Sequence, residues 1–200
     1  MNKPKFFVGL LLAVVLLGFS QSFAQPEKRE IEPSYEVILQ TLVASNDAAD
    51  RAGLPDSLSG TVNKLKTNFA FANYRVVSTH LERISNKGSL FFRSVFKAAG
   101  PEEMSPISTS WQLDSLNSSV DSKGRPGVEF RSFSFEGRIL YKTTVFNEKA
   151  GSMVPATGSD LIELKNQRFN VPENEPTVIG NLALPKSDKQ IFLIITVKPT

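Results

Sequence analysis

The chain contains one histidine, His80, and its neighbours are residue types found in hydrolytic sites. The segment "STHLER" places His80 beside Ser78 and Glu82. A Ser-His-Asp site needs a serine positioned against the base, and a common device for this is a G-x-S-x-G turn. No such turn occurs in the sequence, and His80 falls in the middle of a strand-like run, on the parity opposite Thr79 and Leu81. We therefore predict that His80 faces solvent on a β-strand.

Metal and glycosidase chemistry are also poorly supported by the residues present. With one histidine and no cysteine, a zinc site would depend on carboxylates alone, so no metal site is predicted. Two acidic pairs, Glu102 with Glu103 and Glu173 with Glu175, could resemble the carboxylates of a glycosidase. Both pairs lie in proline-containing loops without neighbouring aromatic clusters, which indicates solvated turns.

The glycines do not form a phosphate-binding loop. Gly124 and Gly127 flank a proline between strand-like runs, which is typical of a turn and not of a helix start. We assign no catalytic, cofactor-binding or metal-binding residues and expect a protein that is not an enzyme. The alternative left open is a small exported hydrolase whose Ser, Asp, Glu and His residues come together from dispersed positions.

The N-terminus has the three-part pattern of a secretory signal peptide. Lys3 and Lys5 precede an apolar run over 6–19, and a small-residue exit ends at Ala24. We expect residues 1–24 to be a signal peptide cleaved after Ala24, with an uncleaved anchor as the alternative. The expected location is the periplasm or the exterior, with no membrane span after cleavage because no second apolar run follows.

Charge and composition narrow the class of partner. The formal net charge is +3, and removing Lys3 and Lys5 leaves a nearly neutral chain without long-range attraction to nucleic acid. Fifteen phenylalanines interleave with basic residues in places, but a sheet core accounts for them. The chain has no cysteine, so its stability must come from core burial without disulfides. We expect no nucleic acid partner.

The first half of the mature chain contains the helical signal. Residues 25–34 are charged and proline-bearing, which indicates a flexible lead, and 35–45 predict a strand. Apolar residues then recur at helical spacing, with a start signal at Pro55 or Asp56. These apolar residues are Leu54, Leu58, Val62, Leu65 and Phe69. Strand-like runs over 73–85 and 88–98 follow, joined by the tight turn "NKG", in which Gly88 can take positive φ.

The second half predicts strands separated by turns. The strand-like runs cover 110–120, 128–146 and 161–172, with a turn at 121–127 and a loop at 147–160. Phe133, Phe135, Ile139 and Tyr141 share one parity, and Arg131 interrupts that face. The predicted fold class is α+β, a mostly antiparallel meander with one N-terminal amphipathic helix, in the order β-α-β-β and then further strands. We expect residues 35–200 to form one domain, with a subdomain break at 98–109 as the alternative.

The last strand, "IFLIITV" over 191–197, is apolar on both parities. Such a strand needs cover on both faces, so we expect it to lie centrally in its sheet. The helix can cover one face, and the other face requires a second layer or a partner. The terminal strand residues are therefore candidates for the core or for a partner-facing surface: Ile191, Phe192, Leu193, Ile194 and Ile195.

The C-terminal segment resembles the closing hairpin of the secretin homology domain. The pattern Asp-Gly-Gln-Thr-Val-Val-Ile-Gly-Gly-Leu of that family is similar to 174–182, and its apolar final strand is similar to 193–199. The second glycine is Asn181 here, and the short "ALPKSDKQ" replaces the long membrane-inserting hairpin of secretins, so the resemblance implies no pore built by this chain alone. Most of 35–200 also resembles a group of uncharacterised exported bacterial proteins, through "LPDSL" and "YRVV".

These patterns together predict an exported envelope protein that works by binding other proteins. The secretin-like hairpin implies an accessory of a secretion or pilus-type assembly, with envelope proteins or further copies of the chain as partners. Strand edges near the terminal strand offer a route for β-augmentation.

Overall fold

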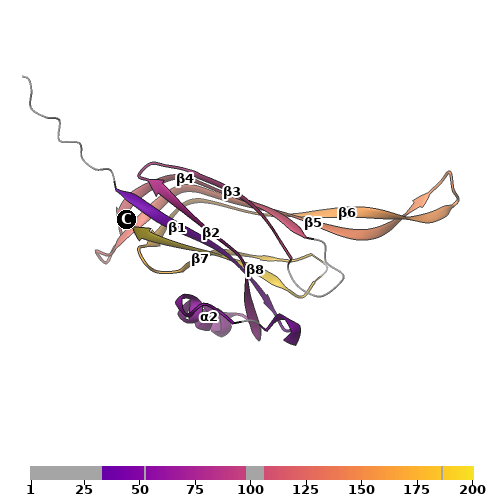
Figure 1. The fold of residues 1–200 in the computed structure, drawn as a ribbon, viewed down its shortest axis with the longest axis horizontal. Coiled ribbons are helices and arrows are strands. Elements are labelled where there is room, and N and C mark those ends of the chain that lie inside the picture. The colour runs from indigo at the N-terminus through magenta and orange to yellow at the C-terminus, as the bar shows by residue number, and fades with distance from the viewer. Residues whose placement is uncertain (1–32, 52, 98–105, 186) are drawn as a thin grey trace, which may run out of the picture. The chain divides into compact units, whose positions relative to one another are not determined.

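The computed structural model describes residues 33–51, 53–97, 106–185 and 187–200, which all belong to one compact unit. In this unit a helix covers one face of a four-stranded sheet, and a second four-stranded sheet covers the other face (Figure 1). The described chain is therefore mostly antiparallel β-structure with one α-helix. Among the described residues, no helix has the length and apolar character needed to cross a membrane.

The first sheet joins the two ends of the described chain. Its strands are β1 (Ser34–Ser45), β2 (Asn73–Ser85), β7 (Thr177–Ala183) and β8 (Gln190–Pro199), in the order β2-β1-β8-β7, and all neighbours are antiparallel. The predicted strand over 35–45 and the central position of the terminal strand are confirmed. Because β8 lies between β1 and β7, both of its edges are paired.

The second sheet is a meander of consecutive strands. It contains β3 (Leu90–Phe96), β4 (Ile107–Val120), β5 (Pro126–Asn147) and β6 (Ser152–Pro172), in the order β3-β4-β5-β6. The predicted meander is thus correct for this sheet but not for the first. The runs joined by "NKG" belong to different sheets, since β2 pairs with β1 and β3 pairs with β4.

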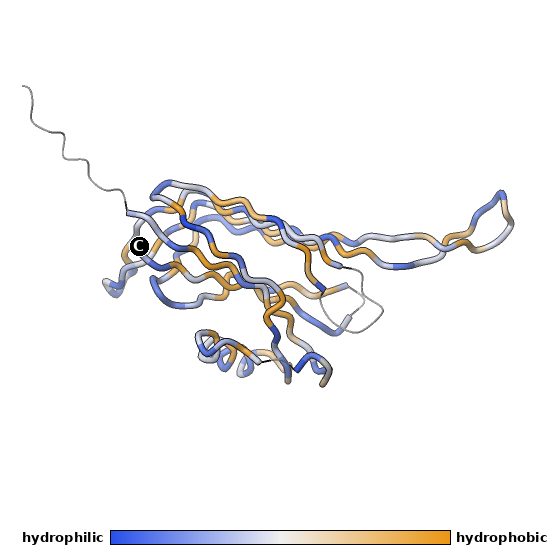
Figure 2. Tube along the Cα trace, viewed as in Figure 1, coloured by the Kyte–Doolittle hydropathy of each residue, from blue (hydrophilic) through white to orange (hydrophobic). Residues whose placement is uncertain are grey.

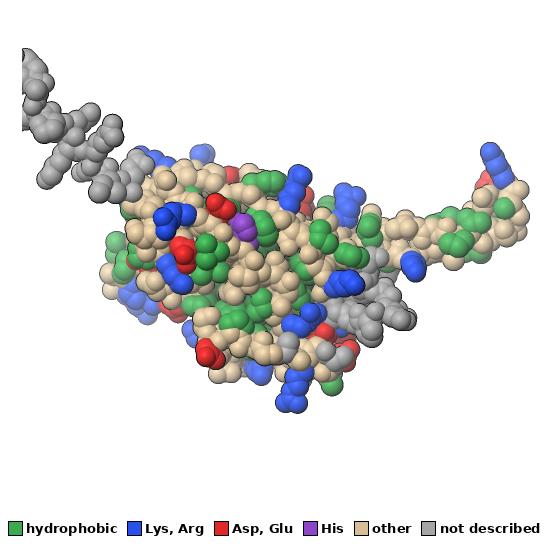
Figure 3. Space-filling model, in the orientation of Figure 1, with side chains coloured by type: hydrophobic (Ala, Val, Ile, Leu, Met, Phe, Trp, Pro, Cys, Tyr) green, Lys and Arg blue, Asp and Glu red, His purple; other side chains and the backbone are tan. Residues whose placement is uncertain are grey.

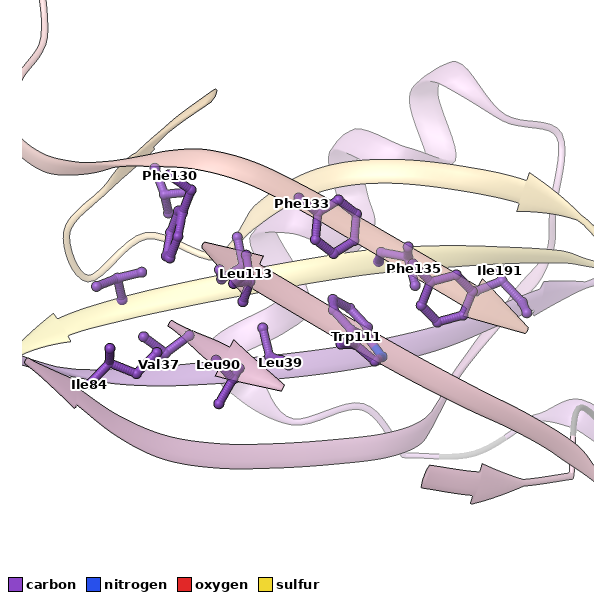
Figure 4. Packing of buried hydrophobic residues seen from close by; sticks show 14 of the residues in the cluster. Val37, Leu39, Ile84, Leu90, Trp111, Leu113, Phe130, Phe133, Phe135 and Ile191 are labelled. Carbon is purple, nitrogen blue, oxygen red and sulfur yellow. The ribbon is translucent and has the colours of Figure 1, made fainter. Parts of the chain in front are cut away.

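The main core lies between the two sheets (Figures 2 and 4). Trp111 packs edge-on against Phe135, with ring centroids 5.4 Å apart, and also contacts Phe133. Opposite these rings, β1 and β8 contribute aliphatic side chains such as Leu39 and Ile191. The buried alternation of Phe133, Phe135 and Ile139 confirms the period-two pattern of this segment.

A second core lies under helix α2 (Asp56–Asn68), which follows the short 3-10 helix η2 (Ala48–Asp50). The buried residues Leu58, Val62 and Leu65 line one side of α2, as their spacing predicts. They pack on Phe192 and Ile194 of β8. The helix thus covers the face of β8 that points away from the second sheet.

The segment predicted as a loop at 147–160 is mostly strand. Only 148–151 form the turn, where Asn147 Oδ1 accepts hydrogen bonds from the backbone N–H groups of Lys149 and Ala150. Gly151 closes this turn with φ of 60°. The residues after it include proline and glycine, which are typical loop residues, but they continue directly into β6.

The "NKG" turn also differs from the prediction in its backbone geometry. Lys87 adopts the positive φ, at 64°, in place of Gly88. Gly88 is required for space instead, because a Cβ there would lie 2.6 Å from Ile84 Cγ2 and 2.8 Å from the carbonyl oxygen of Ser85. The expected signal peptide at 1–24, most of the lead at 25–34 and most of the break at 98–109 lie outside the described residues.

Candidate functional site

The hairpin of β5 and β6 continues well beyond its own sheet. The pairing of β4 with β5 ends at Ile107 opposite Ile139, whereas the pairing of β5 with β6 continues to Asn147 opposite Ser152. Residues 140–159 therefore form a two-stranded arm that projects past the end of β4 (Figure 1). The arm is the most exposed regular structure in the described chain, and none of its residues is buried.

The arm combines exposure with low charge. Its charged residues are Lys142, Glu148 and Lys149, and the last two lie in the turn. Phe146 and Met153 lie opposite each other near the tip and are 62% and 58% exposed. Figure 3 shows hydrophobic side chains along the arm and charged side chains at its tip. Burying the paired apolar side chains against a partner would be favourable, because apolar surface gains free energy on leaving water.

The exposed apolar residues extend from the arm onto the outer face of the second sheet. Leu140 at the base of the arm is 40% exposed, and Leu161 on β6 is 57% exposed. The two are diagonal neighbours on one face, because Leu140 lies opposite Ser159 and Leu161 opposite Arg138. Contiguous exposed apolar side chains of this kind mark interaction surfaces. The arm with its base is therefore the strongest candidate functional site.

Two features hold the arm in shape although no third strand of the described residues pairs with it. The ring of Tyr141 lies over Gly158, where a Cβ would meet Tyr141 Cε2 at 2.4 Å, so an aromatic side chain covers the glycine of the neighbouring strand. The hydroxyl of Tyr141 donates a hydrogen bond to Asp160 Oδ1 at 3.4 Å. Both contacts lie at the base of the arm, where it leaves the sheet.

His80 lies on β2 as predicted, but its side chain is only 23% exposed and turns toward β3, so the prediction that it faces solvent is only partly correct. Its ring stacks on Phe92 of β3 with centroids 3.6 Å apart, and Nε2 lies 3.5 Å from Glu82 Oε2. Leu81, in contrast, is 55% exposed. A bulge in the pairing of β1 with β2 at Val77 is the cause, because one extra residue reverses which parity faces the second sheet.

The Ser-His-acid grouping on β2 has a structural role in this geometry. The Ser78 and Ser94 hydroxyl oxygens lie 3.3 Å apart, which links β2 to β3 across the seam between the two sheets. With His80 stacked on Phe92, these contacts close that side of the sandwich. The alternation of the strand places Ser78, His80 and Glu82 on one face.

A buried ionic cluster lies near the far end of β1. Asp50 is 3% exposed; Lys189 donates a hydrogen bond of 2.8 Å to its Oδ2, and Ser45 donates one of 2.7 Å. Arg75 lies 3.7 Å from Oδ1. Burial alone raises the pKa of Asp50, but the hydrogen bonds from Lys189 and Ser45 and the two positive charges outweigh it and hold the pKa below its ordinary value. The cluster ties η2 to the connection between β7 and β8.

The terminal strand residues proposed as core or partner-facing are all buried. Their exposed fraction is 0% in each case, for Ile191, Phe192, Leu193, Ile194 and Ile195. Alternate members face the helix and the second sheet, and the chain itself covers both faces. The strand that was a candidate for partner binding is therefore core, whereas Phe146 and Met153 of the arm are among the exposed apolar residues.

The remaining candidate residues lie in turns or beyond the described chain. Glu175 contacts Lys64 and Arg125 at 3.8 and 3.7 Å, which places it beside a shallow groove between α2 and the start of β7. Gly124 occupies a turn with φ of 77°. The pair at 102–103 lies outside the described residues. In the described ranges, no group of three or more His, Cys, Asp or Glu residues could hold a metal ion.

Comparison with known proteins shows little. No protein-family model matches the chain, and no curated protein matches it significantly. Among solved structures, the chain is similar to the InvG secretin domain β-barrel from the Salmonella SPI-1 injectisome NC-base, with 10% sequence identity and a TM-score of 0.27. The match covers 98% of this chain and 67% of that chain. At this TM-score the likeness is weak and carries no argument about this chain.

Proposed function

We propose that the protein is an exported envelope protein that acts by binding other proteins through the arm and that it is not an enzyme. The observation that carries this proposal is the arm itself, residues 140–159, which contributes no buried residue yet holds exposed apolar side chains on a regular scaffold. A two-stranded hairpin is only marginally stable in water, so a partner that covers it would stabilise it. The arm thus fits a binding element better than a structural one.

The proposed setting is the periplasm or the exterior, as an accessory of a secretion or pilus-type assembly. The signal-like N-terminus supports export, and the sequence resemblance of 174–182 and 193–199 to the secretin closing hairpin supports the type of assembly. Main-chain hydrogen bonds along a strand edge would give affinity, and the alternating side chains would give specificity.

Site-specific photo-crosslinking in the source organism tests this proposal. A photoreactive residue at Phe146, near the tip of the arm, should crosslink to a protein of the envelope. The matched control is Leu81, which is similarly exposed, at 55% against 62%, but lies on the opposite sheet. Crosslinks of equal yield at both positions, or none at Phe146, would contradict the arm as the binding element.

A further inference from the structure

One edge of β5 in the arm has no pairing strand in the described part of the chain. Along this edge β4 pairs only as far as Ile139, and the strand continues from Leu140 to Asn147. The other edge of β5 pairs with β6 throughout. Sheets of three or more strands are stable where two-stranded hairpins are marginal. Among the described residues, therefore, no strand pairs with this edge beyond the position where β4 stops.

Pro155 determines which backbone groups point outward. It lies opposite Thr144, and having no N–H it cannot donate a hydrogen bond to β5, so its nitrogen faces the outer edge of β6. In an antiparallel pair this orientation alternates residue by residue. Thr144 and its alternate neighbours Leu140, Lys142 and Phe146 thus direct their N–H and C=O groups away from β6. The β5 edge offers donors and acceptors without interruption, whereas Pro155 interrupts the β6 edge.

We propose that the β5 edges of two copies of this chain pair antiparallel about a two-fold axis at Thr143. The two arms would then form one four-stranded sheet in the order β6-β5-β5-β6. This inference rests on the proposed function and specifies one protein partner, a second copy. A two-fold pairing uses the same edge twice, so it avoids the β6 edge that Pro155 blocks.

The side chains along the edge are complementary in this register. Leu140 of one copy lies opposite Phe146 of the other, Lys142 opposite Thr144, and Thr143 opposite itself. Apolar pairs and Thr–Thr pairs are favourable across strands. A register shifted by two residues toward the base would instead place Lys142 opposite Lys142, and like charges directly opposite are unfavourable.

The length of the free edge also fits. The paired segment would run from Leu140 to Phe146, and within the described residues the pairing of β4 with β5 ends just before it, at Ile139. Beyond Phe146 the turn of each arm has to leave the shared sheet, because the next position of the edge, Ile139, already pairs with Ile107 of β4. Each Phe146 would lie between Met153 of its own hairpin and Leu140 of the second copy, which would cover the most exposed apolar pair of the arm.

Because the chain has no cysteine, single cysteine variants test this pairing directly. Thr143 lies on the axis in a pair that is not hydrogen-bonded, where Cα atoms are about 4.5 Å apart and a disulfide can form. The full-length Thr143→Cys variant should form a dimer on mild oxidation that dithiothreitol reverses. The matched control is Ala156→Cys, on the same face of the arm but one strand farther from the axis in each copy. Dimers from both variants alike, or from neither, would overturn the pairing.

Proline substitutions provide a second measurement, with light scattering of the full chain as the readout. Thr144→Pro removes an N–H from the β5 edge and should convert the dimer to monomer. Thr157→Pro makes the same change on the outer edge of β6 and should leave the dimer intact. The opposite pattern would overturn the proposal. A monomeric wild-type chain that still crosslinks an envelope protein through Phe146 would overturn the self-pairing and leave the proposed function standing.

Discussion

Ile194 and Ile195 are neighbours on β8 that face opposite layers, and replacing each by alanine tests the layered fold. Ile194 packs under α2 with Leu58 and Val62, whereas Ile195 lies between the two sheets. Both are 0% exposed. Each substitution removes three carbon atoms, a transfer loss of about 2.4 kcal/mol at about 0.8 kcal/mol per methylene. The cavity left behind adds to this, so we expect a loss of about 3 kcal/mol in the free energy of unfolding for each variant.

Urea denaturation and thermal melting of the full chain measure this loss. In a protein of this size, about 3 kcal/mol corresponds to a fall of about 6–12 °C in the melting temperature. Leu81→Ala is the matched control, because Leu81 lies on the same sheet but is 55% exposed. Its effect should stay within about 0.5 kcal/mol.

The two isoleucine variants give different information. A large loss for Ile195→Ala with a loss near the control for Ile194→Ala would show that α2 does not cover β8. The reasoning about a strand buried on both faces would then be refuted. Equal large losses agree with the two separate cores.

Further predictions concern the ionic cluster and two glycines. Lys189→Met should lower the free energy of unfolding by about 3 kcal/mol, measured in urea at pH 7. The substitution removes the ion pair with Lys189 while the carboxylate of Asp50 stays buried. The folded-state pKa of Asp50 is lowered, so its stabilising effect is present above its unfolded pKa of about 3.9 and is lost as the pH falls below that value. The stability difference between wild type and Asp50→Asn should therefore shrink in urea titrations below about pH 4, and a constant difference would contradict the assignment. Gly60→Ala should raise the free energy of unfolding by about 0.5–1 kcal/mol, and with it the melting temperature, because an exposed position inside α2 has free space for a methyl group. Gly127→Ala should lower it, because the new Cβ would lie 2.7 Å from the carbonyl oxygen of Val171.

Local sequence patterns predicted the elements that depend on local physics. The helical spacing of Leu58, Val62 and Leu65 identified α2, since only a helix brings those residues to one side. The run "NYRVVSTHLERIS" coincides with β2 because its β-branched and apolar residues fit a half-buried strand. The apolar terminal strand correctly indicated a central position with cover on both faces.

Features that depend on distant contacts were not predictable in the same way. The bulge at Val77 reverses the parity of β2 and turns His80 inward, and it is defined by pairing with β1 rather than by the β2 sequence. The part of the arm after Phe146 was predicted as a loop, because Pro155 and Gly158 are typical loop residues. In the structure, Pro155 occupies an edge strand, and the ring of Tyr141 covers Gly158. The scarcity of charge between 140 and 159 is the signal that could have indicated an unusual segment.

The central claim, that the arm is the binding element, is tested most directly by removing it. Replacing residues 141–158 with Asn-Gly would close the hairpin with a two-residue turn at the base of the arm. We expect the melting temperature to stay near that of the wild type, because no buried residue is removed. In the same experiment, capture of the envelope protein identified by crosslinking at Phe146 should be lost in the source organism. A shortened chain that captures this protein as well as the wild type does would contradict the account.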